Sequence, residues 1–76
     1  MTDTNIPEMH AVTSSNVESV GHDGKHLFVR FKNGSTYRYL DCPDTHLHGM
    51  KADASPGRYH NHFIKNGGFL AEKVGG

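Results

Sequence analysis

The sequence has a single cysteine, Cys42, no tryptophan and no long apolar run. One cysteine cannot form an internal disulfide, and small secreted domains usually need several, so a reducing cytoplasm is the expected location. No apolar stretch approaches the roughly 20 residues of a membrane span. Residues 1–5 also lack the basic start of a signal peptide. We therefore expect neither a membrane protein nor a secreted disulfide-rich domain.

The chain also lacks net charge, because eight Lys and Arg residues balance eight Asp and Glu residues. Long-range attraction to nucleic acid or to a membrane is therefore not expected from the whole molecule, and a local cluster must supply it. With 76 residues, the chain forms one domain at most. Its few apolar residues must nearly all be used in one compact core.

Two segments are expected along the chain. Residues 1–11 show neither helical nor strand periodicity and are predicted to be a flexible N-terminal arm. Residues 12–74 are predicted to be a single domain. Its first strand spans 16–22 and is followed by a turn signal, and residues 25–32 alternate as a second strand.

The loop at Gly34 decides which side chains of the next hairpin share a face. A two-residue loop would pair Lys32 with Ser35 and divide the apolar residues between both faces. A three-residue loop, with Gly34 in the left-handed conformation of a bulged turn, pairs Val29 with Tyr37 instead. We expect the bulged hairpin, because it puts one apolar set on one face: Leu27, Val29, Phe31, Tyr37 and Tyr39.

Helical periodicity follows the third strand. The spacing of Leu47, Met50 and Ala54 predicts a short helix of about ten residues that begins near Pro43. A second helix is expected from about residue 55 to 66, with Tyr59, Phe63 and Ile64 facing inward. Residues 69–74 are expected to add an edge strand or a docked tail. The predicted fold is therefore α+β, a three-stranded antiparallel β-meander with two short helices packed on one face.

An ordered set of residues runs through these elements: Val12, Ser14 to Val17, Val20-Gly21, the strand 27–31, Asn33-Gly34, Tyr37-Arg38-Tyr39, Pro43, Ala54, Ser55, Gly57 and Ile64-Lys65. In order and spacing this set resembles the KTSC domain, a small module that occurs alone in bacterial and phage proteins and at the C-terminus of some lysyl-tRNA synthetases. The resemblance covers about residues 12 to 66. Two positions depart from it, since His22 stands where tyrosine is common and Cys42 where valine is common. Attachment to a synthetase implies RNA binding.

The outer face of the hairpin carries the candidate binding site, which consists of Phe28, Arg30, Lys32 and Arg38. An aromatic ring stacks on a base and guanidinium groups bind phosphate, the two features of single-strand recognition. The plainer interpretation is that the arginines only solubilise the strand and that Phe28 is covered by another segment. Both interpretations stay open at this point.

No catalytic residue, metal or cofactor is expected. The sequence has no phosphate-binding loop, no carboxylate pair in motif spacing and no serine nucleophile context. The histidine pairs 46/48 and 60/62 are two residues apart, so on a helix their side chains point about 200° away from each other. Cys42 is expected to be a small buried hydrophobe.

We therefore expect a small non-catalytic binding module that binds RNA or single-stranded nucleic acid through its outer sheet face. The alternative is a protein-interaction module, such as a phage-encoded inhibitor or modulator of a host or defence protein. An aromatic rimmed by arginines suits that role too, because both residue types dominate protein interfaces.

Overall fold

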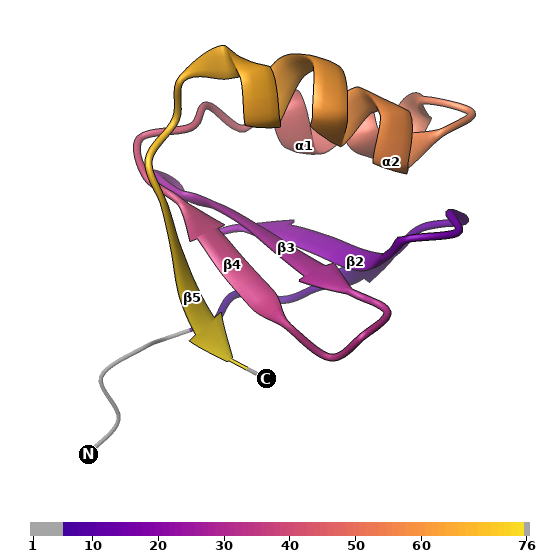
Figure 1. Ribbon diagram of the computed structural model, residues 1–76. Helices are drawn as coiled ribbons and strands as arrows, with labels where there is room; N and C mark the ends of the chain where they lie inside the picture. The colour runs from indigo at the N-terminus through magenta and orange to yellow at the C-terminus, as the bar shows by residue number, and fades with distance from the viewer. Residues whose placement is uncertain (1–5, 76) are drawn as a thin grey trace.

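The computed structural model describes residues 6–75 and places two layers against each other, a β-sheet and a row of short helices (Figure 1). Over these residues the sheet has five antiparallel strands in the order of the chain: β1 (His10–Ala11), β2 (Val17–His22), β3 (Leu27–Phe31), β4 (Thr36–Tyr39) and β5 (Ala71–Gly75). One face of the sheet is covered by α1 (Thr45–Ala52) and α2 (Pro56–Tyr59). The chain continues from α2 through a π turn (His60–Ile64) and a 3₁₀ turn (Lys65–Gly67) into β5.

The predicted α+β class with an antiparallel sheet and short helices is confirmed, but the prediction of three strands is wrong. Both additional strands lie at the edges of the sheet. β5 pairs with β4 along residues 71–75, which is the edge strand offered as one option for the tail. β1 lies within the predicted arm, since His10 pairs with Val20 and Ala11 with Ser19. A strand of two residues is too short to show an alternation pattern, so the sequence did not predict β1. The first five residues of the predicted arm lie outside the described part of the chain.

The bulged hairpin between β3 and β4 is confirmed. Val29 pairs with Tyr37, and the Phe31 N–H donates to the carbonyl of Ser35 at 2.8 Å. Gly34 has a φ of +97°, a conformation that glycine adopts without a Cβ penalty. The predicted apolar face therefore points toward the helices, with Leu27, Val29 and Tyr39 buried and the other two aromatic residues partly buried.

The core lies between the sheet and the helices and contains these buried residues: Val17, Val20, Leu27, Val29, Tyr39, Cys42, Leu47, Met50 and Ile64. Two expected helical positions are wrong. Ala54 is exposed because α1 already ends at Ala52. Phe63 is 53% exposed, whereas His60 and Ile64 are the buried residues of the π turn. Ile64 and Tyr59 face inward as predicted, since Ile64 is buried and the partly buried Tyr59 packs against the core and against Gly49 of α1.

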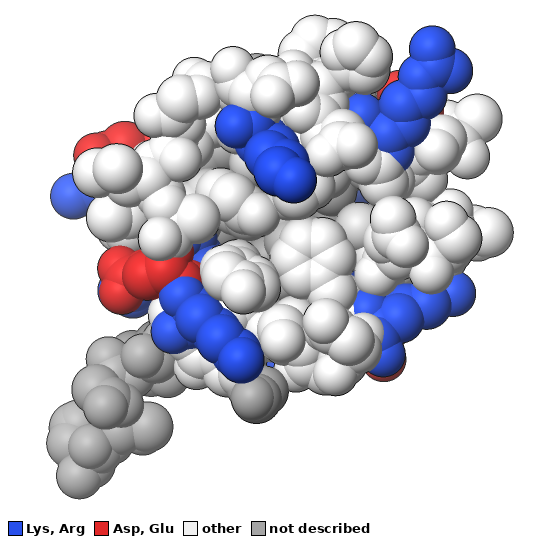
Figure 2. Space-filling model, viewed as in Figure 1, with Lys and Arg blue, Asp and Glu red and all other residues white. Residues whose placement is uncertain are grey.

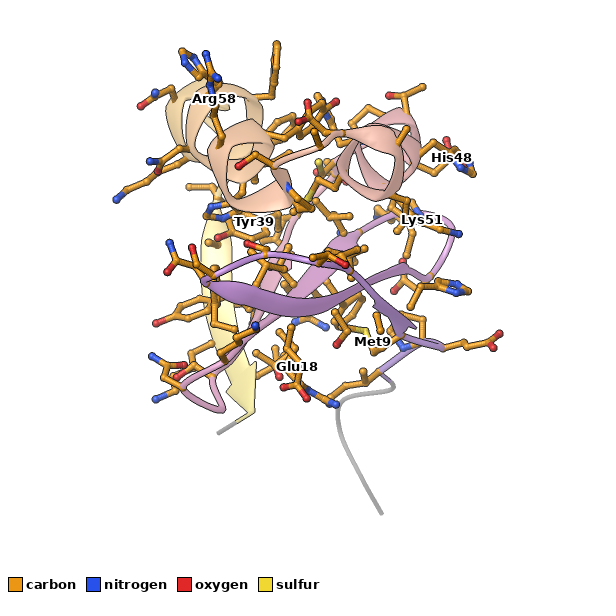
Figure 3. The ribbon with its side chains drawn as sticks, turned by 90° about the vertical axis from the view of Figure 1, so that its right-hand side faces the viewer. Met9, Glu18, Tyr39, His48, Lys51 and Arg58 are labelled. Atoms are coloured by element: carbon orange, nitrogen blue, oxygen red, sulfur yellow. The ribbon has the colours of Figure 1, made fainter. Side chains whose placement is uncertain are left out.

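The outer face of the sheet is also covered. Phe28 is 0% exposed and pairs with Gly21 of β2, so its side chain and a Cβ at Gly21 would share a face. Such a Cβ would lie only 2.6 Å from the Glu8 carbonyl oxygen and 2.8 Å from Met9 Sδ. The segment Pro7–Ala11, here called the N-terminal strap, therefore crosses this face, and Figure 3 shows Met9 on the side of the sheet away from the helices.

Candidate binding cleft between the sheet and the last helix

A cleft of about 710 Å³ opens between one end of the sheet and the helical segment 56–67. This segment consists of α2, the π turn and the 3₁₀ turn and is here called the last helix. This volume lies within the range of sites for small ligands. Three stretches far apart in the sequence form its walls: residues 15–17 before and at the start of β2, residues 31–33 at the end of β3, and Phe69 with Ala71 before and at the start of β5. The two tyrosines of β4 and four residues of the helix complete it.

Aromatic side chains form the apolar part of the cleft. Phe31 meets Tyr37 edge to face with ring centroids 5.8 Å apart, and it meets His60 in the same way at 5.2 Å. Phe69 lines the side toward the tail. Phe31, Tyr37 and Phe69 are only partly buried, so they present ring surface to a ligand. A planar group that enters the cleft would therefore lie next to aromatic rings.

Two buried polar groups face each other in the cleft. The Tyr39 hydroxyl and His60 Nε2 are hydrogen-bonded at 2.6 Å, and Figure 3 shows Tyr39 between the sheet and the helices. Burial lowers the pKa of His60, and the positive charge of Lys65 lowers it further. Burial is also the largest cause that raises the pKa of Tyr39, to about 12. Both groups are therefore uncharged at neutral pH, and the pair offers hydrogen bonds without a formal charge.

The rim of the cleft is polar and positively charged. Its amide and hydroxyl groups come from Ser15, Asn16, Asn33 and Asn61, and its charges come from Lys32 and Lys65. No carboxylate of residues 6–75 is among the lining residues. In Figure 2 the surface between the helices and the sheet is mostly uncharged, with separate basic side chains around it. The neutral chain therefore has a local site that favours an anion.

The structure places three of the four predicted site residues side by side on the outer face, where Phe28 pairs with Arg38 and Arg30 follows two residues along β3, but their side chains are not free to bind as predicted. Phe28 is buried under the N-terminal strap, so the prediction that it is exposed for stacking is wrong. The Nε of Arg30 donates to the Thr36 hydroxyl at 3.1 Å, and Arg38 forms an ion pair with Glu72 of β5 at 2.7 Å. Only Lys32 lines the cleft.

The sequence analysis missed the cleft because its patterns predict most of the cleft residues as core, turn or surface positions. The alternation of β4 predicts Tyr37 and Tyr39 as core residues, and it does not show that the core is open at one end. Asn16, Asn33 and Asn61 read as turn or helix-surface residues. The available signal was Gly57, whose Cβ would lie 3.1 Å from the Ser14 hydroxyl. A glycine early in a helix indicates close approach of another segment.

His22 and Cys42 make structural contacts. In the part of the chain that the structure describes, no group of three or more His, Cys, Asp or Glu side chains is arranged to hold a metal ion. His22 Nδ1 accepts from the Gly24 N–H, so its Nε2 carries the proton and donates to the Cys42 carbonyl at 2.6 Å. Cys42 is 0% exposed, and burial raises the pKa of its thiol to about 11.

Among residues 6–75 no helix has the length and apolar character of a membrane span.

Comparisons with known proteins agree with this architecture. The family model of the KTSC domain matches residues 13–69, and the chain belongs to the KTSC domain family. A curated protein of Tsukamurella paurometabola, named only as a protein, is 36% identical over 59 residues, which cover 75% of this chain and 88% of that one. The crystal structure of a KTSC domain protein from Yersinia pestis is similar with a TM-score of 0.81 and 33% identity, covering 90% of this chain and 97% of that chain.

Proposed function

We propose that this domain is a small non-catalytic binding module that takes single-stranded nucleic acid, RNA or DNA, into the cleft between the sheet and the last helix. One observation carries the proposal: the same cleft combines partly exposed aromatic rings, side-chain amides and lysines, without a carboxylate among its described lining. Aromatic rings stack on bases, amides form hydrogen bonds with base edges, and lysines bind phosphate. A protein of zero net charge would rely on such a local site.

The cleft replaces the outer face as the proposed site. Arg38 is already paired with Glu72 and Arg30 with Thr36, whereas neither Lys32 nor Lys65 is in an ion pair with a described carboxylate. The lysines would therefore lose no existing partner when they bind phosphate. The alternative of a protein-interaction module used Phe28 as its anchor, and that ring is buried.

Fluorescence anisotropy with a labelled single strand of mixed sequence tests the proposal. Each phosphate contact contributes about −0.7 to the slope of log affinity against log salt. Lys32→Ala and Lys65→Ala should each flatten the slope by about that amount. Lys51→Ala is the matched control, because Lys51 is an exposed lysine of α1 outside the cleft lining. Arg38→Ala should behave like the control.

A second variant separates stacking from charge. Tyr37→Leu keeps apolar bulk next to Phe31 but removes the ring, so affinity should fall by about 1–3 kcal/mol with the salt slope unchanged. The proposal is overturned if folded wild-type protein does not bind mixed-sequence RNA or DNA at about 50 mM salt, where phosphate contacts are strong. Binding to a protein partner with no affinity for single strands would favour the interaction module instead.

A further inference from the structure

A second groove adjoins the cleft on the outer side of the helix. It measures about 360 Å³ and is lined by Arg58, Asn61, His62, Lys65 and Asn66. These positions follow the i, i+3, i+4, i+7, i+8 pattern of one helical stripe. Asn61 and Lys65 also line the cleft. The groove and the cleft are therefore continuous across two shared side chains.

The groove has the charge of an anion site. Arg58 and Lys65 are both exposed, and neither is in an ion pair with a carboxylate of residues 6–75. No Asp or Glu in the described chain contributes to its lining. The groove at the opposite end of the sheet differs, because there Lys25 lies with Asp41 and Asp44. Positive charge without compensation is thus a property of this stripe and not of every groove on the molecule.

The two cations are spaced to contact different phosphates. Arg58 lies in α2 and Lys65 begins the 3₁₀ turn, with the five-residue π turn between them. Lys65 stands where the groove meets the cleft, and Arg58 stands farther from it. Figure 3 shows Arg58 on the upper surface of the helix, pointing away from the sheet.

We propose that this stripe is a second subsite, which binds the phosphodiester backbone of the nucleotides adjoining the one in the cleft. This inference rests on the proposed function. The strand leaves the cleft past Lys65 and crosses the helix to Arg58, with Asn61, His62 and Asn66 as hydrogen-bonding partners along the way. The domain therefore recognises a short oligonucleotide and not a single nucleotide.

A length series tests the subsite. Binding of labelled thymidine oligonucleotides of one to six nucleotides is measured for the wild type, Arg58→Ala and the control Lys51→Ala. Wild-type affinity should rise with length beyond one nucleotide, and Arg58→Ala should remove most of that rise while leaving mononucleotide binding unchanged. Contacts by Lys32, Lys65 and Arg58 give a slope of about −2.1, so affinity for the longest strand falls about 18-fold from 50 to 200 mM salt. Arg58→Ala should reduce this fall to about 7-fold.

Failure of the subsite and failure of the proposed function give different results. If Arg58→Ala binds every length with wild-type affinity and slope while Lys65→Ala binds weakly, the subsite is wrong and the cleft remains the site. If the wild type binds no length at about 50 mM salt, both proposals are overturned. Arg58 is exposed and makes no ion pair with a described residue, so folding of its alanine variant is expected and circular dichroism checks it.

Discussion

Truncation of Phe28 has different expected effects for a buried ring and for an exposed ring that stacks on a base. It is 0% exposed but lies outside the core cluster, on the face that the N-terminal strap crosses. Truncation of a buried phenylalanine to alanine costs about 3–5 kcal/mol. A chain of 76 residues has a total stability of roughly 4–11 kcal/mol at typical values per residue. Phe28→Ala should therefore remove a large part of the stability of the domain.

Urea denaturation followed by circular dichroism measures this loss. Leu70→Ala is the control, because Leu70 is 73% exposed and its truncation should change stability by less than about 0.5 kcal/mol. An exposed stacking Phe28 would behave differently, since its truncation would weaken nucleic-acid binding by about 1–3 kcal/mol and leave stability unchanged. A loss of stability below about 1 kcal/mol would refute the buried environment described here.

A thermodynamic cycle tests whether the strap is what covers Phe28. Deletion of residues 1–9 removes the part of the strap that lies against Gly21. In that shortened protein Phe28 is already partly exposed, so Phe28→Ala should cost clearly less than in the full chain. The difference is the interaction free energy between strap and ring, and contacting groups typically show about 0.5–3 kcal/mol. An equal cost in both backgrounds would mean that the strap does not bury the ring.

Three further predictions concern other parts of the fold. Gly34→Val should cost about 1–2 kcal/mol, because the φ of +97° disfavours a Cβ although no atom lies within 4 Å of it; Gly34→Asn should cost less in the same urea titration, and equal stability of all three proteins would contradict this. The unfolding free energy should fall as pH drops below 6.5, because His60 takes up a proton at its ordinary pKa of 6.5 when unfolded but only at a lower pKa when folded; His60→Gln should lose this component, and an unchanged pH profile in the variant would exclude His60 as its source. Alkylation of native Cys42 should be much slower than that of a peptide thiol, because the thiol is buried and its pKa is about 11, and a fast reaction at neutral pH before unfolding would show that the thiol is accessible.

The sequence was sufficient to predict those parts of the fold that follow from the alternation of neighbouring residues. The alternating apolar residues of β3 and β4 have one consistent register, and Gly34 identifies the bulged loop that produces it. That reasoning gives the inner face of the sheet, and it also gives Leu47 and Met50 as buried positions of α1. Each of these results depends on residues that are close together in the chain.

Features set by distant segments were not accessible in the same way. β1 and β2 pair over two residues only. Two residues are too few for an alternation pattern, so the sequence does not predict that the strap covers Phe28. Gly21 carried a signal, since an isolated glycine in a strand indicates close approach of another backbone. The π turn has no sequence signature, and within it His60 is buried while Phe63 is exposed. The cleft could not be predicted either, because its walls come from three stretches of chain that are far apart in the sequence.

The assembly of the cleft from three stretches of chain has a consequence for when the cleft is completed during synthesis. The cleft needs the stretch before β2, the end of β3 and the segment that enters β5, and these contributions extend from Ser15 to Ala71. During translation the hairpin of β3 and β4 can form while the last of these segments is still unmade. The aromatic wall provided by Phe69 is added only after the helices have been synthesised. A nascent chain on the ribosome therefore stays without a complete cleft until its sheet receives β5.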